Sequence, residues 1–83
     1  MVEYTVDYDD RFKKTIGKVD QSFMIKVKKQ VKKIVDNPEI GKPMKNLRKG
    51  TREVYVSPYR LSYYYSKDER LIIFLDFYHK DKQ

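Results

Sequence analysis

The sequence lacks the side chains on which most metal and disulfide proteins depend. It contains no cysteine, no tryptophan and a single histidine, His79, in 83 residues. Without cysteine no disulfide and no cysteine-based zinc site can form, and one histidine excludes a histidine-rich metal site. We therefore expect no metal and no cofactor. The absence of cysteine also suits a reducing compartment.

Long apolar segments are missing as well. The longest apolar stretch, residues 71–75, is far too short to cross a bilayer. The N-terminus has no basic segment followed by an apolar run, so we expect no signal peptide. The length supports one small domain over residues 1–83, with a single two-layer core. These features predict a soluble cytoplasmic domain that does not bind membranes.

Positive charge is abundant and unevenly spread. Nineteen Lys and Arg residues stand against twelve Asp and Glu residues, a formal net charge of +7. Between Lys42 and Arg60 there are six basic residues and one acid, Glu53. Such an excess favours a polyanionic partner, either nucleic acid or an acidic protein segment. The alternative is a lysine-rich surface that serves only solubility.

The apolar pattern predicts a strand, a helix hairpin and three further strands. Asp9 and Asp20 are candidate N-caps of the two helices, and Asn37-Pro38 ends the second one. Short turns between the last three strands make them antiparallel neighbours, and the N-terminal strand completes the sheet. The predicted fold is therefore α+β, with the helix hairpin on one face of a four-stranded, mainly antiparallel sheet. The predicted strands are residues 3–7, 52–56, 59–66 and 71–78, with a loop over 38–50.

Alternation along the strands sorts their side chains between the two faces of this sheet. Leu61, Tyr63 and Tyr65 share one face and should contact the helices. The opposite, open face should carry Tyr64 and Arg60 together with Tyr55 and Glu53. The end of the last strand brings Tyr78, His79 and Lys80 to one rim of the sheet.

His79 stands in the segment Phe77-Tyr78-His79-Lys80-Asp81, close to the C-terminus. Histidine is the side chain whose ordinary pKa best suits acid–base catalysis near neutral pH. The basic, tyrosine-rich surroundings favour RNA as a ligand. The alternative is a surface histidine without a role.

In this order the elements resemble the RelE/ParE toxin superfamily of toxin–antitoxin systems. The segment Asn37-Pro38-Glu39-Ile40-Gly41-Lys42-Pro43 is similar to the connection that follows the second helix in that family. Leu47-Arg48-Lys49-Gly50 and Tyr59-Arg60-Leu61-Ser62-Tyr63 resemble its L-x-G and Y-R-L-x-Y motifs. The resemblance extends over essentially the whole chain.

The resemblance implies a function and a partner. Many members cleave mRNA in the ribosomal A site, are metal-independent endoribonucleases and are neutralised by a cognate antitoxin in a hetero-oligomer. Their phosphate-binding arginine falls on Arg60, and the C-terminal histidine that acts as general acid in the YoeB and YafQ branches falls on His79. Two alternatives remain: a gyrase poison of ParE type that catalyses nothing, and a catalytically weak member that binds only RNA or antitoxin.

No general base carries over from the resemblance. The two lysines that RelE has on the strand before the Y-R-L motif correspond here to Glu53 and Tyr55. Strand alternation makes Glu53 the best substitute for the base, with Asp76 and Asp81 behind it. Arg60 could also simply form a surface ion pair with Glu53. The candidate catalytic residues are thus Arg60, His79 and Glu53, and the candidate RNA-binding residues are Lys45, Arg48, Lys49, Arg52, Tyr55, Tyr64, Tyr78 and Lys80.

Overall fold

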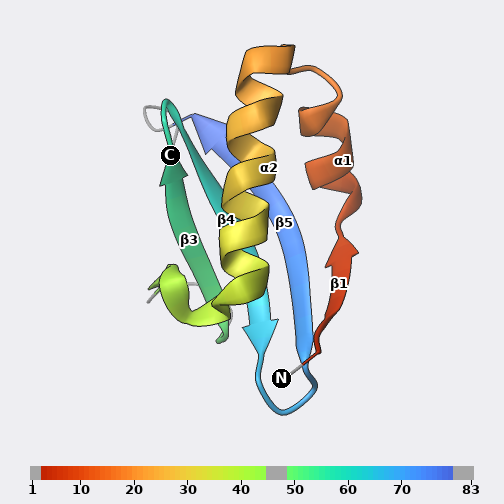
Figure 1. Cartoon of the computed structure of the whole chain (residues 1–83), viewed down its shortest axis with the longest axis vertical. Helices are drawn as coiled ribbons and strands as arrows, with labels where there is room; N and C mark the ends of the chain where they lie inside the picture. The colour runs from red at the N-terminus through yellow and green to blue at the C-terminus, as the bar shows by residue number, and fades with distance from the viewer. Residues whose placement is uncertain (1–2, 45–48, 80–83) are drawn as a thin grey trace.

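A computed structural model of the chain describes residues 3–44 and 49–79 and places two α-helices against one face of a β-sheet (Figure 1). Strand β1 leads into the helix hairpin, a short 3₁₀ helix follows, and the chain then forms the remaining strands. The elements in chain order are β1 Thr5–Tyr8, α1 Asp10–Ile16, α2 Gln21–Asp36, η1 Pro38–Ile40, β2 Lys42–Pro43, β3 Thr51–Val56, β4 Tyr59–Ser66 and β5 Leu71–His79.

The helices begin and end where the sequence predicts. Asp9 precedes α1 and accepts a hydrogen bond from the Arg11 backbone N–H at 2.9 Å. Asp20 precedes α2 and accepts from the Phe23 N–H at 2.8 Å. Both carboxylates satisfy N–H groups that lack a partner in the first turn of a helix. Helix α2 ends directly before Asn37, because the following proline cannot continue it.

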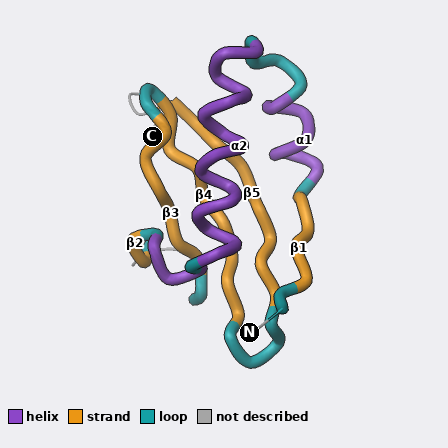
Figure 2. The backbone as a smooth tube through the Cα atoms, viewed as in Figure 1, coloured by secondary structure: helices purple, strands orange, loops and turns teal. Residues whose placement is uncertain are grey.

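The sheet differs from the prediction in strand number. Within residues 3–44 and 49–79 it has five strands in the order β1-β5-β4-β3-β2 (Figure 2). Strands β3, β4 and β5 form the predicted antiparallel meander, while β1 pairs in parallel with β5. The additional strand β2 pairs with Arg52 and Glu53 of β3 inside the segment that we expected to be a loop. The expectation of four strands was therefore wrong, and the sheet is mixed.

The core lies between the helices and one face of the sheet, as the alternation predicts. Val27 and Ile34 of α2 are buried against Leu61 and Tyr63 of β4, and Phe74 of β5 is also fully buried. The buried hydroxyl of Tyr63 is satisfied on both sides. It accepts from the Gly41 N–H at 2.9 Å and donates to the Pro38 carbonyl at 2.7 Å.

Strand β5 contains an irregularity that reverses its alternation. Tyr63 pairs with Phe74, but the preceding Ser62 pairs with Asp76, so Leu75 is an extra residue in β5. Such a bulge shifts every later residue to the other face of the sheet. Consequently Phe74 and Phe77, three positions apart, both lie in the core.

The described residues include no helix long and apolar enough to cross a membrane.

Gly41 lies so close to the ring of Tyr63 that any side chain must displace it. A Cβ atom at this position would stand 2.5 Å from the Tyr63 hydroxyl oxygen. The backbone of Gly41 is extended, with φ −74° and ψ 152°, so the conflict is purely steric. We expect Gly41→Ala to destabilise the protein by about 1–3 kcal/mol, the usual range for overpacking a tight contact. Urea unfolding followed by circular dichroism measures this change. A Gly17→Ala variant serves as control, since a Cβ there finds ordinary contacts at 3.5 Å or more.

Candidate functional site

Three polar side chains from three neighbouring strands meet on the open face of the sheet. In the strand register Arg60 of β4 stands between Tyr55 of β3 and Tyr78 of β5. Glu53 lies two residues before Tyr55 and therefore points to the same face. The opposite face at this level carries Val54, Leu61 and the other core residues, which anchor the strands against α2.

Glu53 joins the other two side chains. Arg60 Nη1 donates to Glu53 Oε1 at 3.0 Å, and the Tyr78 hydroxyl donates to Glu53 Oε2 at 2.7 Å. The side chains of Arg60 and Glu53 are 32% and 17% exposed, so solvent and a ligand still reach the pair. We call Glu53, Arg60 and Tyr78 the open-face cluster. Within the described residues each oxygen of the Glu53 carboxylate accepts one hydrogen bond, and the bond from Arg60 orients the guanidinium.

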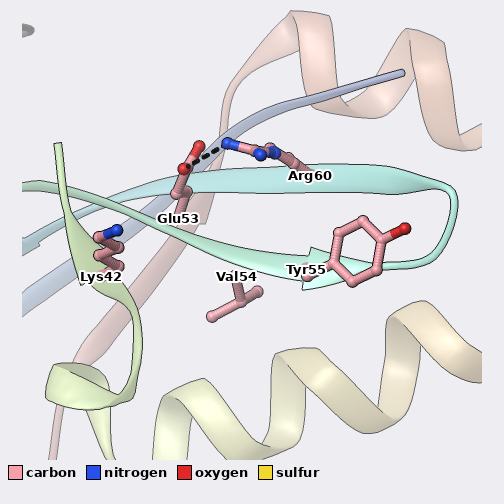
Figure 3. A pocket seen from close by; sticks show the side chains of 5 residues that line it. All are labelled: Lys42, Glu53, Val54, Tyr55 and Arg60. Carbon is pink, nitrogen blue, oxygen red and sulfur yellow. Dashed lines mark hydrogen bonds and ion pairs between the residues drawn. The ribbon is translucent and has the colours of Figure 1, made fainter. Parts of the chain in front are cut away.

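The open-face cluster borders a shallow hollow of about 350 Å³. Figure 3 shows Glu53 and Arg60 on one side of the strands, with Val54 extending toward the other side. Tyr55 is 57% exposed at the rim, which makes its ring available for stacking. Lys42 from β2 completes the lining. A polyanion in this hollow would therefore meet Arg60 and Lys42, with Glu53 as the one acid among the described lining residues.

The position of Tyr78 keeps its hydroxyl protonated. Burial raises the pKa of Tyr78 to about 12, and the hydrogen bond to the Glu53 carboxylate adds to this effect. A neutral phenol remains a donor to Glu53 throughout the physiological pH range. It can pass a proton on only to a strongly basic group such as an alkoxide.

The side chains of His79 and Arg60 lie on opposite faces of the sheet. His79 pairs with Tyr59, and its ring meets the Tyr59 ring edge-on with a centroid separation of 5.6 Å. Tyr59 in turn contacts Phe23 of α2, so both rings lie on the helix side of the sheet. The bulge at Leu75 is the physical reason, because it exchanges the faces of the residues that follow. A catalytic role for His79 stays a prediction, but in this structure its side chain is on the other face from the open-face cluster.

Arg52, one of the predicted RNA-binding residues, lies on the helix side of the sheet, away from the open face. It pairs with Tyr63 and donates from Nη1 to the carbonyl oxygens of Glu39 and Gly41, at 3.0 and 2.7 Å. Its guanidinium thereby holds the connection after α2 against the edge of the sheet. The placement follows from alternation, since Arg52 has the same parity as the helix-facing Val54.

The other predicted RNA-binding residues have mixed positions. Tyr64 is on the open face, at the far end of β4 from Arg60, and its hydroxyl contacts the Glu69 carboxylate at 3.3 Å. Lys49 is exposed in the turn before β3. Lys45, Arg48 and Lys80, as well as the reserve base Asp81, lie outside the described residues. The reserve base Asp76 accepts from the Thr15 hydroxyl at 3.1 Å and lines a second hollow on this face together with Tyr78.

Sequence reasoning missed two features of the site. Lys42 was assigned to a loop, and a two-residue strand containing proline gives no periodic signal that would have revealed it. The link between Tyr78 and Glu53 depends on the bulge in β5, which shifts the pairing by one residue. Among the described residues no three His, Cys, Asp or Glu side chains are grouped so that they could hold a metal ion.

Comparisons with known proteins identify relatives of both the sequence and the fold. A family model described as "ParE toxin of type II toxin-antitoxin system, parDE" matches residues 2–83. The isolated RelE toxin of E. coli is similar in structure, with a TM-score of 0.79, 18% identity and coverage of 96% of this chain and 87% of that one. No curated protein sequence matches the chain.

Two further structural relatives are toxins solved together with an antitoxin. The E. coli DinJ-YafQ toxin-antitoxin complex matches with a TM-score of 0.81, 18% identity and coverage of 96% of both chains. The RelBE2 toxin-antitoxin complex of Mycobacterium tuberculosis matches with a TM-score of 0.78, 23% identity and coverage of 95% of this chain and all of that one. At these identities the likeness establishes the fold.

Proposed function

The chain belongs to the ParE toxin family of type II toxin–antitoxin systems, and we propose, from the geometry of its open-face cluster, that it is a toxin that cleaves mRNA on the ribosome. The observation that carries the proposal is the Glu53 carboxylate, held between the Arg60 guanidinium at 3.0 Å and the Tyr78 hydroxyl at 2.7 Å. It combines a phosphate ligand, a proton acceptor and a proton donor on one accessible face of the sheet.

Each residue of the open-face cluster has a role in the proposed reaction. The guanidinium of Arg60 binds the non-bridging oxygens of the scissile phosphate and stabilises the charge that grows there. Glu53 accepts the proton of the 2′-hydroxyl as that oxygen attacks phosphorus. The exposed ring of Tyr55 is placed to stack a base, an interaction worth about 1–3 kcal/mol per base.

The leaving 5′-oxygen also needs a proton, and Tyr78 is the donor on this face. As the P–O5′ bond breaks, the Tyr78 hydroxyl gives its proton to the 5′-oxygen and recovers one from Glu53. The 2′-hydroxyl proton is thereby relayed to the leaving group, and the products are a 2′,3′-cyclic phosphate and a 5′-hydroxyl. No charge or proton is left over. We assign this step to Tyr78 rather than His79, because the tyrosine shares the face of Arg60.

The partner in the cell is proposed to be a cognate antitoxin. The RelBE2 and DinJ-YafQ relatives are toxin–antitoxin complexes, and the net charge of +7 fits an acidic antitoxin segment. The second candidate function, poisoning of DNA gyrase, is favoured by the family model itself, which is named for ParE toxins.

One expression experiment separates the two candidate functions. We expect induced toxin to stop translation and to leave cuts within translated messages, with 5′-hydroxyl ends downstream of each cut. Primer extension on an induced and an uninduced culture maps the cuts. A frameshifted, untranslatable copy of the same message is the control and should stay intact. Intact translated messages together with trapped gyrase–DNA complexes would refute the ribonuclease proposal.

A further inference from the structure

The solvent face of α2 carries five lysines. Lys26, Lys29 and Lys33 follow one another at spacings of three and four residues and so form one row along the helix. Lys28 and Lys32 form a second row four residues apart. All five side chains are exposed, while Val27 and Ile34 of the same helix are buried in the core. We call these five residues the α2 lysine face.

Little in the described part of the chain neutralises this charge. Asp36, at the last position of α2, is the one acid in the helix. Asp20 precedes the helix, and its pKa is lowered by the Phe23 N–H and the Ser22 hydroxyl, with a smaller effect of Lys26. No ion pair joins any of the five lysines to a residue that the structure describes. Like charges at these spacings repel one another, so the five lysines lower the stability of α2.

The α2 lysine face and the open-face cluster lie on opposite sides of the molecule. Helix α2 covers one face of the sheet (Figure 1), and Arg60 and Glu53 lie on the other face. A short nucleic-acid segment bound at the open-face cluster therefore cannot also contact the α2 lysine face. The two surfaces can be occupied by different partners at the same time.

We propose that the α2 lysine face binds the phosphate backbone of double-helical RNA. Lysine ammonium groups are point charges that need only phosphates within reach, and such contacts are independent of sequence. An acidic peptide is a poorer fit, because peptide helices dock apolar anchors into grooves. Among the described residues of α2, Ile25 is the one large apolar side chain that is exposed, so the helix offers a peptide few apolar anchors.

This binding extends the proposed function but does not depend on cleavage. If the protein acts on the ribosome, duplex RNA is the polyanion that surrounds it there. The lysines would hold the protein against that duplex while the opposite face receives the single-stranded message. Only the statement that the bound duplex belongs to the ribosome rests on the proposed function. The affinity of the α2 lysine face for duplex RNA can be tested without ribosomes.

The test measures binding of the whole chain to a labelled RNA hairpin of about 16 base pairs by fluorescence anisotropy at several salt concentrations. The triple variant Lys28→Gln, Lys29→Gln, Lys32→Gln should bind about tenfold or more weakly, and its slope of log Kobs against log salt should become shallower by about 2 to 3. The charge-matched control Lys14→Gln, Lys18→Gln, Lys67→Gln removes three exposed lysines outside α2 and should keep most of the slope.

Several outcomes would overturn the inference. An unchanged slope in the α2 triple variant, or an equal loss in the control triple variant, means that the α2 lysine face is not a distinct site. Tighter binding of a DNA duplex of the same sequence, or displacement of the RNA by an acidic helical peptide at lower concentration, assigns the surface to another partner.

Two further measurements keep this result separate from folding and from the proposed cleavage. The thermal midpoint of the α2 triple variant should be no lower than that of wild type, because the substitutions relieve repulsion and glutamine is as good a helix former as lysine. Wild type that binds the hairpin through the α2 lysines yet leaves translated mRNA intact would refute the cleavage proposal and leave this inference standing.

Discussion

Arg60→Ala should slow single-turnover cleavage of ribosome-bound mRNA by a factor of about 10²–10³. Loss of one group that stabilises developing charge commonly costs about 2.7–4 kcal/mol in the transition state. Glu53 would also lose its 3.0 Å contact with the guanidinium and stand beside the phosphate with its charge unbalanced. The measurement is quench-flow cleavage of a message in a programmed ribosome with enzyme in excess, so that product release does not contribute.

The folded state should hardly respond to this substitution. The pair of Arg60 and Glu53 is partly exposed, and such pairs are worth about 0–1 kcal/mol. Arg52→Ala is the matched control, since it removes an arginine of the neighbouring strand that holds two backbone carbonyls on the other side of the sheet. We expect Arg52→Ala to lower stability and to leave the cleavage rate of the folded fraction near wild type. If Arg60→Ala cleaves within threefold of wild type, the open-face cluster is not the active site.

Glu53→Gln should remove most of the cleavage rate while RNA binding stays equal or becomes tighter. A general base contributes about 10²–10⁴-fold, and an amide of the same shape cannot accept the 2′-hydroxyl proton. The amide also removes the one acid in the hollow, which repels the phosphate in the ground state. Opposite effects on rate and on binding distinguish a base from a residue that only positions Arg60. Single-turnover rates and filter binding of a non-cleavable 2′-deoxy message give the two quantities.

Two further variants distinguish Tyr78 from His79 as the general acid. Tyr78→Phe removes the hydroxyl that donates to Glu53 at 2.7 Å and should lower the rate, whereas His79→Ala should retain a rate close to wild type. The wild-type rate should show no decline through neutral pH, because a phenol with a pKa of about 12 stays protonated there. An imidazole acid would instead produce a descending limb near neutrality. Such a limb that disappears in His79→Ala would assign the step to the histidine.

Side-chain alternation predicted the open face well because β3 and the first half of β4 are regular. Glu53, Tyr55 and Arg60 were placed together from period-two spacing alone, and the pairing of β3 with β4 places them on one face. The ion pair between Glu53 and Arg60, considered from the sequence as a surface contact, is present. It is also the centre of the site, since Tyr78 joins it from the next strand.

The remaining parts of the site depend on interactions that leave no periodic trace in the sequence. Strand β2 has two residues and exists because β3 offers an edge to pair with. Alternation places Arg52 on the helix side of the sheet, but its two backbone acceptors come from the connection after α2, which has no regular pattern. The faces of Tyr78 and His79 are decided by the unpaired Leu75, and a bulge inside an apolar run cannot be seen in its composition.

That single unpaired residue decides which of the two candidate acids shares the face of Arg60. In a regular β5 the pairing that begins at Leu71 would continue unshifted, with His79 on the face of Arg60 and Tyr78 against α2. The residue opposite Arg60 would then be Phe77, whereas with Leu75 unpaired it is Tyr78, whose hydroxyl reaches Glu53. Removing Leu75 would restore a regular β5 and leave Tyr78 opposite Arg60, whereas closing the bulge without a change in length would move His79 to that face. Which of the two side chains stands beside Arg60 thus depends on how β5 pairs with β4, and not only on the residues that β5 contains.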